Sequence, residues 1–394
     1  MSVSVIGTYH SKVGNLDKDL YELIEEVGQG VLEDAPVEAA DVGQIFIGNY
    51  SSGGFNDQEH LAPYTVNIDP DLRFTPATKF ENACASGSAA IEAAVDALEA
   101  GKIDYALVLG AEKMTSLDTA GVTKTLGMAS YWPTEGSEGM TFPGLFAEFA
   151  KGYRERYDLS DEELHEILAK IAAKNYNNAL ANPLAQMPMD CTYQDILDMP
   201  DEKNPMIAPP LRLNDCSLVS DGAAALVLTR TEDAKELTDE VVEISSLVHT
   251  TDYLEIAKRS NSEFVAGKKA VEQAYQESGI TVDDLDFAEV HDCFTIAELL
   301  AYETLGLADD GEGAKLLDDG TVDLDGELPI NASGGLKAKG HPVGATGDSV
   351  AVLAARQLLN NAIGNQIEGA ETGMTFNIGG SAASNYALVF KKLK

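Results

Sequence analysis

Cys84 is the first residue whose type and position suggest chemistry. It lies in the stretch 79–90, where an extended segment runs directly into a helix of small residues that ends near Gly101. A thiol at the start of a helix lies near unpaired backbone N–H groups and the positive end of the helix dipole, which favour the thiolate. This position predicts a nucleophile, although a buried and inert cysteine would produce the same local pattern.

Two loops in the second half of the chain carry further reactive side chains. His291 and Cys293 follow a predicted strand and precede a helix, and His341 lies in the glycine-rich stretch 331–347 between another strand and helix. Each histidine alone could be a structural residue. All of these stretches, like that of Cys84, lie at strand-to-helix junctions in corresponding places of the two halves, so we predict that they meet in one site.

The hydrophobic pattern predicts an α/β fold that contains an internal duplication. The order strand, helix, strand, loop, helix, strand, strand occurs twice. The predicted strands are 3–7, 44–48, 105–110, 221–228, 241–248, 287–291, 328–331, 374–378 and 385–390. Besides the helix that follows Cys84, the predicted helices are 16–31, 146–157, 161–180, 264–278, 296–305 and 345–361. Two similar halves packed together place their matching loops at a shared interface.

One segment interrupts this order and divides the first half. Residues 1–114 and 211–235 are expected to form the first half, and residues 236–394 the second. The intervening 115–210 contains the only tryptophan, several prolines and two predicted helices, the second of which is predicted to begin with Ser160 as its N-cap. We interpret it as an inserted cap over a substrate site, and a helical packing layer is the alternative.

The charge of the chain is strongly negative. Its 65 acidic and 27 basic residues leave a formal net charge of −38, and the acidic residues recur along much of the sequence. Such a surface repels nucleic acids and anionic membranes, and it also repels itself unless salt screens it. This predicts a protein that works at high salt, and an ordinary acidic cytosolic protein is the alternative.

The cysteines and the N-terminus indicate the compartment. The four cysteines (84, 191, 216 and 293) are far apart and form no C-x-x-C pair, which argues against a zinc site or a disulfide framework. The first residues do not resemble a signal peptide, and no apolar run approaches the roughly 18 residues of a membrane span. We expect a cytoplasmic protein.

Five separated motifs resemble those of the thiolase family of coenzyme A (CoA)-dependent acyltransferases, over nearly the whole chain. They are Asn82-Ala83-Cys84-Ala85-Ser86-Gly87, Ser220-Asp221-Gly222-Ala223-Ala224-Ala225, His291-Asp292-Cys293-Phe294, Gly340-His341-Pro342-Val343-Gly344-Ala345-Thr346-Gly347 and Asn377-Ile378-Gly379-Gly380. The common biosynthetic thiolases carry a second catalytic cysteine where this chain has Asn377. The cysteine of the His-Asp-Cys-Phe motif instead matches sterol-carrier-type and archaeal thiolases, and with the acidic composition it suggests a haloarchaeal member.

The resemblance implies a thiolase fold of duplicated βαβαβαββ halves in five layers (α-β-α-β-α), with the inserted loop domain covering CoA. It implies a homodimer or homotetramer that uses CoA thioesters as substrates, with no further cofactor and no metal. A role in mevalonate synthesis follows from the archaeal subtype. So does a complex with hydroxymethylglutaryl-CoA synthase and a small OB-fold zinc-ribbon protein.

The resemblance also implies roles for the reactive residues in an acetyl-CoA C-acetyltransferase. Cys84 is the nucleophile, His341 its base, Cys293 the acid/base of the condensation, and His291 a donor to the enolate oxygen. A second oxyanion hole is expected from the backbone N–H groups of Cys84 and Gly379.

CoA is expected to contact Ser220, Gly222, Arg212 and Lys124, with Lys151 and Arg154 as further candidates for the phosphates. A degradative thiolase for longer 3-ketoacyl-CoA is the nearest alternative function. A non-catalytic, thiolase-like scaffold subunit is an alternative from a different class. A hydroxymethylglutaryl-CoA synthase or ketoacyl synthase would share the fold, but the His341 loop and Cys293 favour a thiolase.

Overall fold

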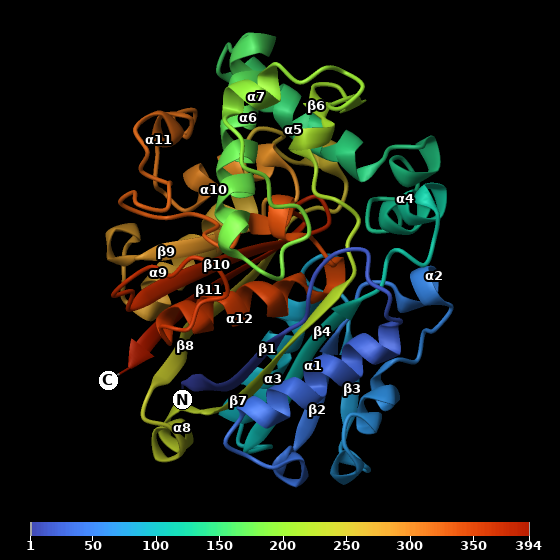
Figure 1. Ribbon diagram of the computed structural model, residues 1–394, viewed down its shortest axis with the longest axis vertical. Coiled ribbons are helices and arrows are strands. Elements are labelled where there is room, and N and C mark those ends of the chain that lie inside the picture. The colour runs from blue at the N-terminus through green and yellow to red at the C-terminus, as the bar shows by residue number, and fades with distance from the viewer. Residues whose placement is uncertain (1, 394) are drawn as a thin grey trace.

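The computed structural model describes residues 2–393 (Figure 1). Its strands are β1 (Val3–His10), β2 (Gln44–Gly48), β3 (Ala77–Phe80), β4 (Tyr105–Glu112), β5 (Met206–Ala208), β6 (Leu211–Arg212), β7 (Gly222–Arg230), β8 (Val241–Thr251), β9 (Phe287–Val290), β10 (Thr372–Gly379) and β11 (Ser384–Leu393). Its α-helices are α1 (Leu20–Asp34), α2 (Ser52–Asn56), α3 (Ser86–Glu99), α4 (Thr119–Gly127), α5 (Phe142–Arg156), α6 (Asp161–Asn178), α7 (Tyr193–Leu197), α8 (Thr231–Leu237), α9 (Val265–Ser278), α10 (Thr295–Thr304), α11 (Lys315–Asp318) and α12 (Thr346–Leu358).

The strand order shows the predicted duplication. A mixed nine-stranded sheet runs β3-β2-β4-β7-β1-β8-β11-β10-β9. In each half the first strand (β1 or β8) lies beside the last strand (β7 or β11). Next to the last strand comes β4 or β10, and then β2 or β9, so the two halves have the same strand order. The halves are joined by a short antiparallel contact in which Val3–Val5 of β1 pairs with 242–244 of β8.

The apolar clusters define the five layers. One cluster joins α1 to the outward faces of β1, β2, β4 and β7. A second contains α3, α12 and strands from both halves, and a third joins α5, α6, α9 and α10 to the second half of the sheet. Small residues such as Ala94 and Ala355 in the second cluster let the two central helices pack closely between the half-sheets. In Figure 1, α12 lies between the strands of the two halves.

Most predicted elements are present with boundaries shifted by a few residues, and two differences have clear causes. The first helix begins at Leu20, not residue 16, because Asp19 caps it and forms a reciprocal capping box with Glu22. The predicted strand 328–331 is reduced, within residues 2–393, to one bridge between Ala288 and Ile330. Asn331 has a left-handed φ of 57°, which ends the extended conformation.

The inserted segment packs against α10 of the second half, and its helices α5, α6 and α7 lie in the upper part of Figure 1. It contains α4 to α7 and β5, and β6 extends it to residue 212 because β5 and β6 form a small hairpin. Helix α5 is fixed to α10: the rings of Phe146 and Phe294 stack with centroids 4.5 Å apart, and Tyr153 donates to Glu303 at 2.6 Å. Helix α6 begins with the predicted Ser160 cap.

Within residues 2–393, no helix combines the length and the apolar composition needed to cross a membrane.

Candidate active site

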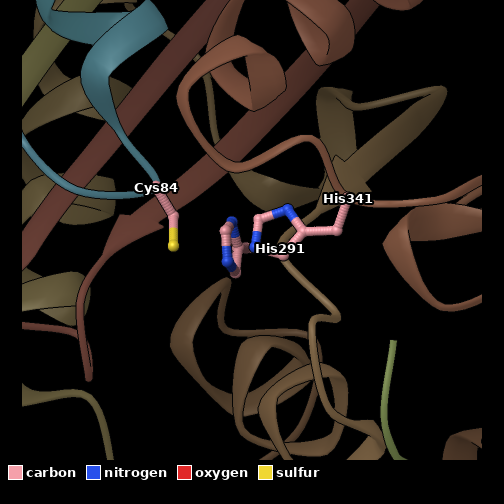
Figure 2. A group of neighbouring side chains, drawn as sticks. All are labelled: Cys84, His291 and His341. Carbon is pink, nitrogen blue, oxygen red and sulfur yellow. The ribbon is translucent and has the colours of Figure 1, made fainter. Parts of the chain in front are cut away.

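The structure brings three of the predicted residues together. The ligand-capable atoms of Cys84, His291 and His341 lie within 4.8 Å of one another, and all three side chains are buried. They come from the loop before α3, the loop after β9 and the loop before α12, and Figure 2 shows them pointing toward one another. Cys293 lines the same cavity as Cys84 and His341.

A strained turn presents Cys84 to this site. Strand β3 ends at Phe80 and α3 begins at Ser86. Between them Ala83 has a φ of 51°, a left-handed conformation that costs a non-glycine residue about 1–2 kcal/mol. The Ser86 hydroxyl stabilises the turn, because it accepts the N–H of Asn82 at 2.9 Å and donates to the carbonyl of Ala83 at 2.7 Å.

Burial outweighs the preference for the thiolate that the helix terminus was expected to give Cys84. Burial raises the pKa of the Cys84 thiol to about 12, although the backbone N–H of Gly380 hydrogen-bonds to the sulfur and opposes this shift. The cost of burying a charge therefore exceeds the stabilisation from the helix terminus. Cys84 rests as a thiol and needs a base at the moment of attack.

The hydrogen bonds of His341 leave it suited to act as that base. The hydroxyl of Thr346 donates to the carbonyl of Pro342 at 3.1 Å, so its oxygen accepts the Nδ1–H of His341 at 2.8 Å. The lone pair then lies on Nε2. Burial, aided by the charge of Lys339, lowers the pKa of His341 to about 3, so the imidazole is neutral.

The hydrogen bonds of His291 give it the opposite character. The amide NH₂ of Asn377 donates to Nδ1 of His291 at 2.8 Å, so Nε2 carries the proton. This Nε2 is buried and has no hydrogen-bond partner among residues 2–393. Burial, with the neighbouring His341 and Lys339, lowers the pKa of His291 well below its usual range. His291 is thus a neutral N–H donor whose ring lies beside Cys84 and His341.

The cavity suits a narrow, largely apolar substrate arm. It encloses about 300 Å³ and extends from Cys84, Cys293 and His341 between α4, α5 and β5. Its lining is mainly apolar and includes Met114, Val122, Leu126, Phe142, Ile207, Val343 and Phe294. Burial and the nearby Cys84 raise the pKa of the Cys293 thiol well above its usual range, so it too rests protonated.

Two of the residues predicted to contact CoA do not line the active-site cavity. Ser220 and Gly222 are buried, and Ser220 is fully inaccessible. The Ser220 hydroxyl instead accepts the backbone N–H of His341 at 3.0 Å, and Gly222 begins β7 against Pro342. Both residues contact the loop that carries His341 and help to position it.

The predicted cationic contacts lie outside the active-site cavity. Lys124 is exposed on α4, whose neighbouring Thr123 lines the cavity. Arg212 lines a second cavity of about 340 Å³ together with Lys151, Arg154 and His165.

The final glycine turn lies against the loop that carries Cys84, as predicted, but the glycine whose amide contacts the sulfur is a different one. A Cβ at Gly379 would lie 2.5 Å from the carbonyl oxygen of Asn82, so only glycine fits there. The amide that contacts the thiol of Cys84 belongs to Gly380. The sequence did not predict the roles of Thr346, Ser88 and Asn377. Of these residues, only Asn377 was marked in the sequence, because it departs from a family motif.

Comparisons with known proteins agree with this geometry. The profile described as "Thiolase, N-terminal domain" matches residues 3–232, and that described as "Thiolase C-terminal domain-like" matches residues 249–392. The chain belongs to the thiolase family. This thiolase is 38% identical over 392 residues to the acetyl-CoA acetyltransferase of Methanothermobacter thermautotrophicus, with 99% of each chain covered. It is also 38% identical over 351 residues to the acetyl-CoA acetyltransferase of Methanocaldococcus jannaschii, which covers 88% of this chain and 86% of that one.

More distant relatives share the fold. Sterol carrier protein 2 of Gallus gallus is 30% identical over 394 residues, which cover 96% of this thiolase and 69% of that protein. The solved Bacillus anthracis acetyl-CoA acetyltransferase superposes with a TM-score of 0.75 at 18% identity, covering 100% of this chain and 99% of that one. The chain is a thiolase-type acyltransferase.

Proposed function

We propose that this thiolase is an acetyl-CoA C-acetyltransferase that condenses two acetyl-CoA to acetoacetyl-CoA and CoA through an acetyl group on Cys84. The observation that carries the proposal is the complementary pair of neutral imidazoles beside the thiol. His341 offers a lone pair and His291 offers an N–H, and each ring has a nitrogen within 4.8 Å of the Cys84 sulfur. Full-length relatives at 38% identity named acetyl-CoA acetyltransferase support it.

The first half-reaction transfers an acetyl group. The proton of Cys84 moves to Nε2 of His341 as the sulfur attacks the thioester carbonyl, so a C–S bond forms and a tetrahedral oxyanion develops. Backbone N–H groups at Cys84 and in the Gly379–Gly380 turn support that oxyanion. The C–S bond to CoA then breaks, and the departing thiolate takes the proton of Cys293 and leaves as CoA.

The second half-reaction forms the carbon–carbon bond. The Cys293 thiolate removes a proton from the methyl group of the second acetyl-CoA, and its raised pKa makes it a strong base. The enolate oxygen is stabilised by the N–H of His291 and by protonated His341. The enolate carbon attacks the acetyl group, the C–S bond to Cys84 breaks, and His341 returns its proton to the Cys84 sulfur.

The nucleotide end of CoA is proposed to bind in the second cavity. Successive residues of a strand point to opposite sides, and in β5 Ile207 lines the active-site cavity while Met206 lines the second one. Arg212, Lys151 and Arg154 offer cations there in a chain of net charge −38. Arg212 is bound at 2.7 Å to exposed Asp201, a partner that phosphate could replace.

The wider context of this reaction is part of the proposal. Acetoacetyl-CoA from such an enzyme would feed mevalonate synthesis. The enzyme would act as a homodimer or homotetramer, in a complex with hydroxymethylglutaryl-CoA synthase and a small OB-fold zinc-ribbon protein. A degradative thiolase acting on longer 3-ketoacyl-CoA would use the same residues. Thiolysis assays across 3-ketoacyl chain lengths distinguish the two functions.

The test is acyl-enzyme formation from acetyl-CoA in molar KCl. The wild type and Cys191→Ala should release a burst of CoA and gain one acetyl group by mass spectrometry. Cys191 is a matched control because its half-buried thiol lies outside the active-site cavity. Cys84→Ala should show neither, and a persisting burst in this variant would overturn the proposal.

A further inference from the structure

We propose that Asn377 is a positioning residue that sets the tautomer of His291, and that in doing so it keeps metal ions out of the active site. The inference rests on the proposed function, in which the Nε2–H of His291 stabilises the enolate. Asn377 stands where the common biosynthetic thiolases carry a cysteine, so the role of an amide at this position requires an explanation.

A relay of buried side chains holds Asn377 in one orientation. Its Oδ1 accepts the hydroxyl proton of Ser88, in the first turn of α3, at 2.7 Å. Its NH₂ group donates to Nδ1 of His291 at 2.8 Å and faces the carbonyl oxygen of Cys84 at 3.3 Å. A rotated amide would place its oxygen against that carbonyl oxygen, which cannot donate, whereas the Ser88 hydroxyl can donate or accept. The carbonyl of Cys84 therefore selects the observed orientation.

This orientation decides which nitrogen of His291 carries the proton. Because Nδ1 accepts the amide proton, the neutral ring must carry its own proton on Nε2. The exposed fractions of Asn377 and His291 are 1% and 2%, so water does not compete for Nδ1. The unpartnered Nε2–H is then a preorganised donor.

The same tautomer bears on metal binding. A thiol and two imidazoles whose ligand atoms lie within 4.8 Å of one another are a donor set typical of zinc. Histidine binds a metal through a nitrogen lone pair, and Nε2 of His291 has none while Asn377 donates to Nδ1. Removing that donation should expose a latent metal site.

Asn377→Asp tests this directly. A carboxylate at this position accepts a hydrogen bond from Nδ1–H, so the ring proton lies on Nδ1 and the lone pair on Nε2. This is the carboxylate–histidine arrangement that supports zinc ligands. After dialysis against Zn²⁺ and then buffer, Asn377→Asp should retain about one equivalent per chain and the wild type far less. In ¹⁵N spectra of histidine-labelled protein, one ring should change from the Nε2–H to the Nδ1–H tautomer.

Ser88→Ala and Asn385→Asp complete the design. Ser88→Ala removes one hydroxyl and frees the amide to rotate, so zinc retention should lie between those of the wild type and Asn377→Asp. Asn385 is a buried asparagine of β11 whose amide donates to the carbonyl of Ala382 at 3.1 Å. Asn385→Asp is the control and should retain as little zinc as the wild type. Metal-free Asn377→Asp should lose condensation on the order of 10²-fold and keep the CoA burst.

The readouts separate this inference from the proposed function. Retention of the Nε2–H tautomer in Asn377→Asp, or zinc retention equal to that of the wild type, would overturn the positioning role. A changed tautomer with undiminished condensation would uphold the positioning role and instead remove His291 from the proposed mechanism.

Discussion

The hydroxyl oxygen of Thr346 lies 2.8 Å from Nδ1 of His341 and donates its own proton to the carbonyl of Pro342. This pair determines that the lone pair of His341 faces the cavity. Asn377 has the opposite effect on His291, because it donates to Nδ1. Two histidines of the same chemistry therefore serve as acceptor and donor, and their rings meet edge to face at 89° with centroids 4.9 Å apart.

Thr346→Val should slow acylation. Valine keeps the shape of threonine but offers no acceptor to Nδ1–H of His341, so the tautomer with the lone pair on Nε2 loses its support. The rate of the CoA burst is expected to fall on the order of 10²-fold, the range of general base catalysis. Thr346→Ser keeps the hydroxyl and should stay within a few-fold of the wild type, and equal burst rates in all three proteins would contradict the role.

The sequence was enough to find the reactive residues but not the residues that orient them. Cys84, His291 and His341 follow from one rule, that loops at strand-to-helix junctions of a duplicated fold converge. Ser88 could not be found in this way, because its partner Asn377 is 289 positions away and buried serines are common. That contact depends on how α3 packs against β10, which local patterns do not encode.

Other differences between the sequence-based predictions and the structure have the same origin. The family motif that contains Ser220 predicts a ligand contact, whereas in the structure the Ser220 hydroxyl accepts the backbone N–H of His341. The helix-terminus argument for a Cys84 thiolate considered local dipoles and not the depth of burial, which raises its pKa. In contrast, Ser160 was correctly predicted as a helix cap because capping is a local interaction.

Cys293→Ser should separate the two half-reactions. Serine occupies nearly the same volume, and in this variant CoA can leave as its thiolate beside protonated His341, so acylation of Cys84 is retained. A serine alkoxide is far harder to form than a thiolate. Condensation should fall on the order of 10²-fold or more while the CoA burst remains. Exchange of solvent deuterium into the methyl group of acetyl-CoA provides a direct readout and should be lost in parallel. Near-normal exchange in Cys293→Ser would remove it from the acid/base role.

The pH dependence of Cys84 alkylation should lack the plateau of an ordinary thiol. Because the pKa of Cys84 is raised to about 12, its thiolate fraction grows about tenfold per pH unit through about pH 10. Iodoacetamide labelling, followed by mass spectrometry of the Cys84 peptide, should follow this slope in the absence of substrate. A plateau near the usual cysteine pKa of about 8.5 would contradict the dominance of burial.

Salt should stabilise the folded chain. A net charge of −38 creates self-repulsion that ions screen within about 10 Å at 0.1 M and about 3 Å at 1 M. The melting temperature is expected to rise by several degrees or more from low salt to molar KCl. Sucrose at matched water activity is the control, since it acts by exclusion without screening charge, and an equal rise in sucrose would argue against charge repulsion.

Asp348 is the carboxyl group whose removal should stabilise the protein. It lies on α12 and is fully buried. Its Oδ2 packs tightly against α3 and β4, because a Cβ placed on Gly87 or Gly110 would lie only 2.3 Å or 2.1 Å from this oxygen. Neither oxygen has a hydrogen-bond partner in the described part of the chain. An unsatisfied buried polar group costs about 1–3 kcal/mol, so Asp348→Ala should raise the free energy of unfolding, less the cost of a small cavity.

The pH dependence of this effect gives the sharper test. Burial raises the pKa of Asp348 well above its usual range, so the folded state holds a proton that the unfolded chain releases near pH 4. The contribution of this proton to the free energy of unfolding is therefore fully present below that pH. As the pH rises, the free energy of unfolding of the wild type falls by up to about 1.4 kcal/mol per pH unit. The advantage of Asp348→Ala over the wild type should thus grow from pH 5 to pH 8 in molar KCl. An advantage that is constant with pH would show that the carboxyl titrates normally, because every other group is common to both proteins.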